Sequence, residues 1–141
     1  MKFYILGHGP LQARLERVVQ STGLNYSVIF DHLDDPSSIV NRSMVHVCIV
    51  DYDNSTNQSL LEGMASGCAI VASDVGETQS IVTPNVEMLV SLEPRVVAYA
   101  VSHLLAHPEL CNKVGRAARR KAETNHHVNG NLEYLTRPHR F

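Results

Sequence analysis

The sequence predicts an α/β fold in which a mainly parallel sheet of five strands is covered by helices on both faces. Short apolar runs alternate with segments of helical periodicity, which is typical of repeated β-α-β units. One run, residues 45–50, is apolar almost throughout, as strands covered on both faces are. The 141 residues suit a single domain, since domains usually have roughly 100–200 residues.

The first half of the chain is predicted to hold three strands. Residues 2–6 form an apolar run that ends at a Gly-His-Gly-Pro turn, and apolar residues then recur at helical spacing from Leu11 to Gly23. Residues 27–30 are expected to form the second strand. An acidic turn over residues 31–35 and a short helix from Pro36 follow, because proline suits a first helical turn. Residues 45–50 are the third expected strand.

The second half is predicted to hold two further strands and longer helices. After a polar loop, Ser59 and Glu62 have the spacing of a capping box, which predicts a helix that starts at Ser59. Gly67 is expected to end that helix in a left-handed conformation. Strands are expected over residues 69–72 and 87–90, with a helical segment over 78–82 between them. Helices over about 94–106 and 108–123 complete the prediction.

Composition and charge exclude several classes of function. Lys and Arg number 12 against 14 Asp and Glu, so we expect no nucleic-acid partner. We interpret the basic cluster at residues 116–121 as a solvated helix face, with a polyanion contact as the less favoured alternative. No apolar run of 18 residues and no leader pattern is present, so we expect neither a membrane span nor a signal peptide.

The cysteines and histidines predict no metal centre and no disulfide framework. Cys48, Cys68 and Cys111 have wide, unpatterned spacing, which we interpret as reduced core residues of a cytoplasmic protein. Among the eight histidines only the adjacent pair His126 and His127 stands out, and neighbours in sequence cannot point the same way on a helix. We therefore expect no metal site.

The loops at the carboxyl ends of the strands are where a parallel sheet binds ligands. These loops are residues 7–10, 31–35, 51–59 and 73–78. Gly7 and Gly9 suggest a turn that approaches a phosphate, but Gln12 stands where a dinucleotide fingerprint needs its third glycine. Binding of an NAD-type dinucleotide is therefore not favoured.

The segment from Asn54 to Glu62 joins a polar turn to a helix start. Free amides and the helix dipole favour a phosphate at such a start. A carboxylate one turn into the helix, Glu62, can accept two ribose hydroxyls. Alternatively, Glu62 only closes the capping box and points at solvent. The residues by themselves favour neither interpretation.

The stretch from Ser59 to Glu77 resembles a known signature. It runs Ser-Leu-Leu-Glu-Gly-Met-Ala-Ser-Gly-Cys-Ala-Ile-Val-Ala-Ser-Asp-Val-Gly-Glu and is similar to the C-terminal, donor-binding domain of retaining GT-B glycosyltransferases of the family-4, or group 1, type. The similarity covers about residues 3–123. It implies a Rossmann-like three-layer αβα sandwich, half of a GT-B fold, over residues 1–124, with a polar tail over 125–141.

The resemblance also implies a nucleotide-sugar site. The donor would be a UDP- or GDP-sugar, with no other cofactor and no metal. Glu62 would hold the ribose, the amides of residues 59–61 would face the diphosphate, Leu33 would lie beside the base, and the first glycine turn would leave room for the nucleotide. The positions implied are Ser59, Leu60, Leu61, Glu62, Gly7, Gly9 and Leu33.

Three departures from the family pattern bear on catalysis. Asn54 stands where the family has a glutamate that contacts the donor sugar, and residues 55–58 are bulkier than the family's glycine-rich sugar loop. The family also places a strand and helix, with a diphosphate-binding Arg and Lys, ahead of what is residue 2 here. Each such donor is worth roughly 10²–10³ in rate. We therefore expect an N-terminally truncated domain that does not catalyse hexosyl transfer alone.

Two hypotheses on function follow from these departures. The first is a donor-binding domain that recognises a nucleotide-sugar and works with a separate acceptor-domain chain or as a homo-oligomer. The alternative is a non-catalytic fold remnant or protein-interaction module without a ligand. In either case the family's central strand is missing, and we predict that residues 2–6 and 45–50 pair directly, giving strand order 2-1-3-4-5, because unpaired buried amides are costly.

Overall fold

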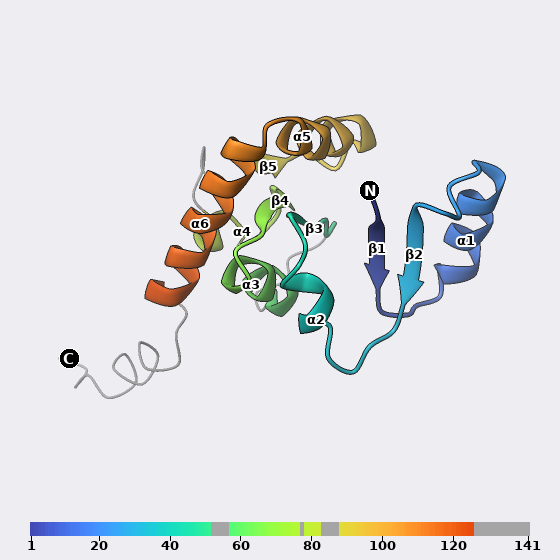
Figure 1. Cartoon of the computed structure of the whole chain (residues 1–141), viewed down its shortest axis with the longest axis horizontal. Helices are drawn as coiled ribbons and strands as arrows, with labels where there is room; N and C mark the ends of the chain where they lie inside the picture. The colour runs from blue at the N-terminus through green and yellow to red at the C-terminus, as the bar shows by residue number, and fades with distance from the viewer. Residues whose placement is uncertain (52–56, 77, 83–87, 126–141) are drawn as a thin grey trace. The chain divides into compact units, whose positions relative to one another are not determined.

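The computed structural model describes residues 1–51, 57–76, 78–82 and 88–125 (Figure 1). The chain divides into two units, Met1–Ser38 and Ile39–Phe141, which we call unit 1 and unit 2 and describe separately. The short helix α2 (Ser37–Val40) spans the boundary. No helix in the described ranges is long and apolar enough to cross a membrane.

Unit 1 is a single β-α-β motif. Strand β1 (Phe3–Leu6) and strand β2 (Val28–Asp31) pair in parallel, with helix α1 (Gln12–Ser21) between them in the chain. The ladder runs from Phe3 opposite Val28 to Leu6 opposite Asp31. These elements agree with the strands and helix that the sequence predicts here.

Unit 2 contains the other three strands, paired in parallel in the order β3-β4-β5. Its elements also agree with the predicted ones in kind and order. They are β3 (Val45–Cys48), α3 (Gln58–Ala65), β4 (Ala69–Ser73), α4 (Thr78–Ile81), β5 (Met88–Val90), α5 (Pro94–Ala106) and α6 (Pro108–Asn125).

The core of unit 2 forms around β4, all five residues of which are buried. Ala69 and Val71 on this strand pack with Leu104 of α5 and with Val114 of α6. The alternate residue Ile70 is also fully buried, so both faces of the strand are covered. The apolar run of residues 69–72 suits that double burial.

Helix α3 ends as its sequence predicts. Gly67 has φ +76° and its amide donates to the carbonyl of Met64, while the amide of Cys68 donates to that of Gly63. These two bonds define a Schellman motif, which needs the left-handed conformation that glycine adopts at low cost. Helix α6 passes directly over this turn, since a Cβ on Gly115 would lie 2.1 Å from the Gly67 carbonyl oxygen.

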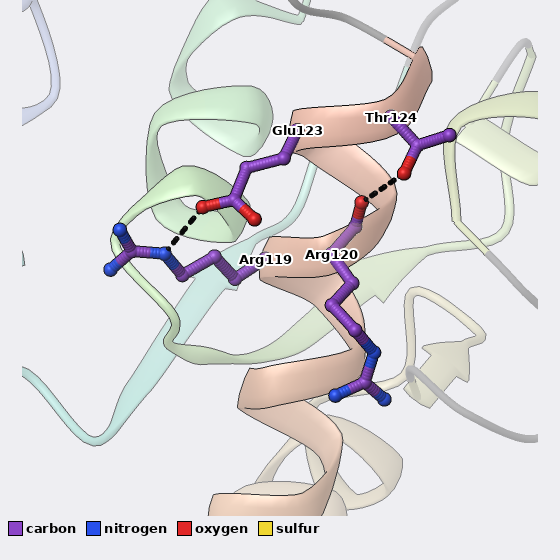
Figure 2. A network of polar contacts seen from close by, with 4 residues as sticks. All are labelled: Arg119, Arg120, Glu123 and Thr124. Atoms are coloured by element: carbon purple, nitrogen blue, oxygen red, sulfur yellow. Dashed lines mark hydrogen bonds and ion pairs between the residues drawn. The ribbon is translucent and has the colours of Figure 1, made fainter.

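The surface of α6 carries the basic cluster. The Arg119 guanidinium pairs with Glu123 one turn later at 2.9 Å, and the Thr124 hydroxyl donates to the Arg120 carbonyl (Figure 2). Arg116, Arg119 and Arg120 are exposed. The opposite face of the helix contributes Cys111, Val114 and Ala118 to the core.

All three cysteines are buried and none forms a disulfide, as the sequence predicts. Burial raises the pKa of the Cys68 thiol to about 11, with a smaller contribution from the neighbouring Cys111. Both thiols donate to backbone carbonyls, Cys68 to that of Val40 and Cys111 to that of Met44. They act as small core side chains.

The α/β class is confirmed, and every pairing between described strands is parallel. Within the two units the strands pair as β1-β2 and as β3-β4-β5. The direct pairing of residues 2–6 with 45–50 would join unit 1 to unit 2 and stays a prediction. Each ladder joins strands that follow one another in the chain.

Candidate functional site

The candidate site in unit 2 is built on the first turns of α3. The helix begins at Gln58, and the side chain of Asn57 caps it by accepting from the Leu60 amide at 3.1 Å. The predicted capping box of Ser59 and Glu62 is therefore wrong. Asn57 takes the cap because its side chain is buried against β3, where its Nδ2 donates to Cys48 Sγ at 3.0 Å.

Because the cap lies two residues earlier than predicted, Glu62 has no capping role. Its side chain lies on the exposed surface of α3, where Gln58 Nε2 donates to Glu62 Oε1 at 2.8 Å. A carboxylate has two oxygens with about four acceptor positions, so one bond to Gln58 leaves most of its accepting capacity for another partner.

The three amides that were predicted to face a diphosphate differ in availability. The Leu60 amide donates to Asn57 Oδ1 and the Leu61 amide to the Asn57 carbonyl at 3.2 Å. Both are thus engaged inside the helix. The Ser59 amide precedes the first regular helical bond, so by helix geometry it is the one of the three directed outward for an anion.

His46 of β3 lies against this part of α3 and was missed by the sequence analysis. Its Nε2 is 3.2 Å from the Ser59 hydroxyl oxygen. The imidazole occupies a notch that only glycine provides, because a Cβ on Gly63 would lie 2.5 Å from the ring. A histidine inside an apolar strand, together with a glycine inside a helix, was the available signal.

Burial lowers the pKa of the half-buried His46, and the opposing charge of Glu62 raises it by a smaller amount. A neutral imidazole therefore faces the Ser59 hydroxyl. A neutral histidine offers one donor and one acceptor nitrogen, so it orients that hydroxyl without adding a full positive charge beside Glu62.

The chain that leaves β3 toward the site is held by β4. The buried Ser73 hydroxyl accepts from the Val50 amide at 2.9 Å and donates to the Val50 carbonyl at 2.8 Å. The side chain therefore replaces a backbone partner at the carboxyl end of the ladder. The exposed Asp74 follows, with Gln79 donating to its carboxylate.

The predicted nucleotide contacts of unit 1 lie at the carboxyl ends of β1 and β2. Gly7 has φ +106°, and its amide donates to the Asp31 carbonyl at 2.8 Å, which extends the parallel ladder by one bond. Gly9 follows in the same turn, and no atom lies within 4 Å of a Cβ built there. Leu33 is half-buried in the loop after β2. The predicted sugar contact Asn54 and residues 55–56 lie outside the described residues.

Sequence comparisons give a consistent result. Residues 1–107 match the profile of a family described as Glycosyl transferases group 1. A curated relative from Mycobacterium tuberculosis, a GDP-mannose-dependent alpha-(1-6)-phosphatidylinositol dimannoside mannosyltransferase, is 25% identical over 122 residues. The match covers 86% of this chain and 31% of the relative, so the chain spans about a third of the curated relative's length.

Solved structures share the fold. A glycosyltransferase from Rickettsia africae superposes with a TM-score of 0.86 at 16% identity, over 98% of this chain and 41% of that one. HepE from Anabaena in complex with UDP gives 0.86 at 16% identity, over 96% and 40%. The C-terminal domain of a group 1 glycosyl transferase from Francisella tularensis gives 0.73 at 22% identity, over 84% and 63%.

Proposed function

Because the chain belongs to the Glycosyl transferases group 1 family, we propose that it is the part of a glycosyltransferase that binds the nucleotide-sugar donor. The observation that carries the proposal is the start of α3. There an exposed carboxylate, Glu62, lies one turn from an outward-directed amide at Ser59, and the first provides acceptors for hydroxyls while the second provides a donor for a phosphate.

The ribose is assigned to Glu62. A carboxylate can accept from the 2′ and 3′ hydroxyls together, and hydrogen bonds to a charged group contribute about 1.5–3 kcal/mol each. Gln58 already donates to one carboxylate oxygen, which restrains the side chain before the ligand arrives. Restraint of this kind lowers the entropy lost on binding.

The diphosphate is assigned to the first turn of α3, at the Ser59 amide. His46 holds the Ser59 hydroxyl from the strand side, so that side chain is positioned as well. The positive end of the α3 dipole adds to the attraction, typically by 0.3–1 kcal/mol for a group at the surface. Gly7, Gly9 and Leu33 remain predicted nucleotide contacts.

The donor is proposed to be a UDP- or GDP-sugar. HepE from Anabaena has been solved with UDP and with UDP-glucose, and the curated mycobacterial relative is described as GDP-mannose-dependent. Transfer of the hexosyl group is assigned to this segment acting together with an acceptor-binding partner, since the chain corresponds to only 31% of that relative's length. By itself the chain binds donor and does not transfer it.

Calorimetric titration tests the proposal. The chain is titrated with UDP, GDP, UDP-glucose and GDP-mannose, and with each in the Glu62→Gln variant. Loss of the carboxylate is expected to weaken binding of the preferred nucleotide by about tenfold or more, since it removes charge from two hydrogen bonds. The matched control is Glu109→Gln, which neutralises an exposed glutamate on a different helix, in the first turn of α6.

Two results would contradict the proposal. One is the absence of binding to all four nucleotides, which would favour the alternative of a non-catalytic interaction module. The other is equal binding by the Glu62→Gln and wild-type chains. A transfer assay with the isolated chain is run in parallel, and measurable hexosyl transfer would overturn the assignment of catalysis to an assembly with an acceptor-binding partner.

A further inference from the structure

Two histidines of unit 1 lie side by side although 24 positions separate them in the chain. The Nδ1 atoms of His8 and His32 are 3.3 Å apart. Their ring centroids are 4.5 Å apart and the ring planes are perpendicular. Both side chains are exposed, so both can be reached by a ligand from solvent.

The backbone brings the two rings together from separate loops. The register places Leu6 opposite Asp31, so His8 and His32 leave the carboxyl ends of two paired strands. Gly7, which has a positive φ of +106°, sets the direction in which the backbone continues into His8. The Asp31 carboxylate accepts from the His32 amide at 2.9 Å, which fixes the backbone at the second histidine.

We propose that His8 and His32 form a two-histidine site for a divalent transition-metal ion of the Zn²⁺ class. Zinc binds imidazole nitrogen at about 2.0–2.1 Å in tetrahedral geometry. Two ligands on one tetrahedral ion are separated by about 1.63 bond lengths, or about 3.3–3.4 Å for that bond length. The observed Nδ1 to Nδ1 distance of 3.3 Å equals this separation.

The 3.3 Å separation also allows a hydrogen bond between the rings. An exposed imidazole exchanges such a bond with water at little net gain, so that bond by itself gives little reason for the pairing. A shared cation gives both nitrogens a strong partner at once. Imidazole nitrogen is a preferred ligand of zinc, copper and nickel ions.

The charge of the surrounding segment also favours a cation. Asp31 precedes His32 directly, and the exposed Asp34 and Asp35 follow two and three residues after it. Carboxylates in this number raise the local concentration of divalent cations. The Asp35 carboxylate itself accepts from the Ser37 amide.

The site has two protein ligands. Among the described residues no group of three or more His, Cys, Asp and Glu side chains could hold a metal ion, so the remaining coordination positions of the His8 and His32 site are left to water or to an oxygen of an exogenous anion. The sequence predicts no metal site because its histidines show no convincing ligand spacing, and 24 positions separate His8 from His32. The inference does not depend on the proposed donor binding.

The test is a zinc titration of the full chain followed by two-bond ¹H–¹⁵N spectra of the imidazoles at about pH 7.5, where ordinary imidazoles are neutral. We expect the Nδ1 signals of His8 and His32 to shift together before one equivalent of Zn²⁺ is reached. His8→Ala is expected to abolish the response of His32, and His32→Ala that of His8. Both residues are exposed, so neither change should unfold the chain, which circular dichroism checks.

The matched control is the pair His103 and His107 on α5, whose ring centroids are 4.4 Å apart. His107→Ala removes one ring of this pair and should leave the zinc response of His8 and His32 unchanged. The proposal is overturned if the His8 and His32 signals stay in place through one equivalent of Zn²⁺, if His32 still responds in the His8→Ala variant, or if His103 and His107 respond first.

Discussion

The two units differ in how they use apolar residues. In unit 1, no residue is buried, and helix α1 exposes Leu15 to 40% and Val18 to 51%. In unit 2, all of β4 is buried, and Leu104 of α5 is 0% exposed. Buried apolar area is the main source of stability, so unit 2 supplies most of the stability of the chain.

The two units also differ in how their candidate functional groups are supported. Unit 1 places the exposed rings of His8 and His32 just beyond a two-stranded ladder, where few contacts oppose substitution. Unit 2 builds its site on α3, whose Leu60 and Met64 are fully buried. Changes in unit 1 are therefore expected to report on ligands, and changes in unit 2 on both ligands and folding.

The largest contrast is expected between two leucine truncations. Leu104→Ala removes a fully buried side chain from the core and should lower the free energy of unfolding by about 2–5 kcal/mol. Leu15→Ala, in a position 40% exposed, should cost less than about 1 kcal/mol. Urea unfolding of the full chain measures both, and equal effects would contradict the assignment of stability to unit 2.

A glycine comparison tests the packing of α6 on the α3 turn. Gly115→Ala should cost about 3 kcal/mol, since the new Cβ would lie 2.1 Å from the Gly67 carbonyl oxygen and overpacking of this kind is costly. In an open helix the same change would be favourable by about 1 kcal/mol. Gly9→Ala is the control, because nothing lies within 4 Å of its Cβ; a more stable Gly115→Ala variant would refute the close approach.

The Asn57 cap should contribute a smaller amount. Asn57→Ala removes the acceptor for the Leu60 amide and the donor to Cys48, and we expect a loss of about 1–2 kcal/mol. Asn112→Ala, at an exposed position of α6, serves as the control and should change stability by less than about 0.5 kcal/mol. If Ser59→Ala proved as costly as Asn57→Ala, the helix start would have to be reassigned to Ser59.

His46 predicts a dependence of stability on pH in unit 2. Burial lowers its pKa in the folded chain below the ordinary value of 6.5, so the unfolded chain binds more protons between the two values. The stability that the neutral His46 contributes is fully present above the pKa of the unfolded chain. It is lost as the pH falls from about 6.5 toward the lower pKa of the folded chain. Thermal unfolding between pH 7.5 and 5 should show the loss, and His46→Gln should flatten it.

A comparison variant separates His46 from the other titrating groups. His103→Gln changes a half-buried histidine of α5 whose ring stacks on Tyr99, and its unfolding is measured over the same pH range for comparison. If the stability of the His46→Gln chain changed with pH as steeply as that of the wild-type chain, the half-buried imidazole would not be the source of the pH dependence.

Local patterns predicted most elements because their causes are local. The alternation of apolar runs with helical periodicity gave the strands and helices in order, and Gly67 marked the end of α3 because a left-handed residue is needed there. The start of α3 was misplaced because Ser59 and Glu62 match a capping box, whereas Asn57 takes the cap through its contact with Cys48 on β3. That contact depends on tertiary structure.

The groups that the sequence did not reveal are those whose partners are distant in the chain. His46 meets Ser59 across 13 positions, and His8 meets His32 across 24. Neither spacing is a motif. The packing of α3 against β3 brings His46 to Ser59, and the register of β1 with β2 brings His8 to His32.

The smallest expected effect is that of the ion pair between Arg119 and Glu123 on α6 (Figure 2). Their side chains are 58% and 56% exposed, so water and salt screen the charges, and a pair one turn apart on a helix contributes about 0.3–0.5 kcal/mol. A double-mutant cycle with Arg119→Ala and Glu123→Ala should give a coupling of that size that shrinks as salt is added. A coupling above about 1 kcal/mol that resists salt would mean that this face of α6 is shielded from water, contrary to its exposure here.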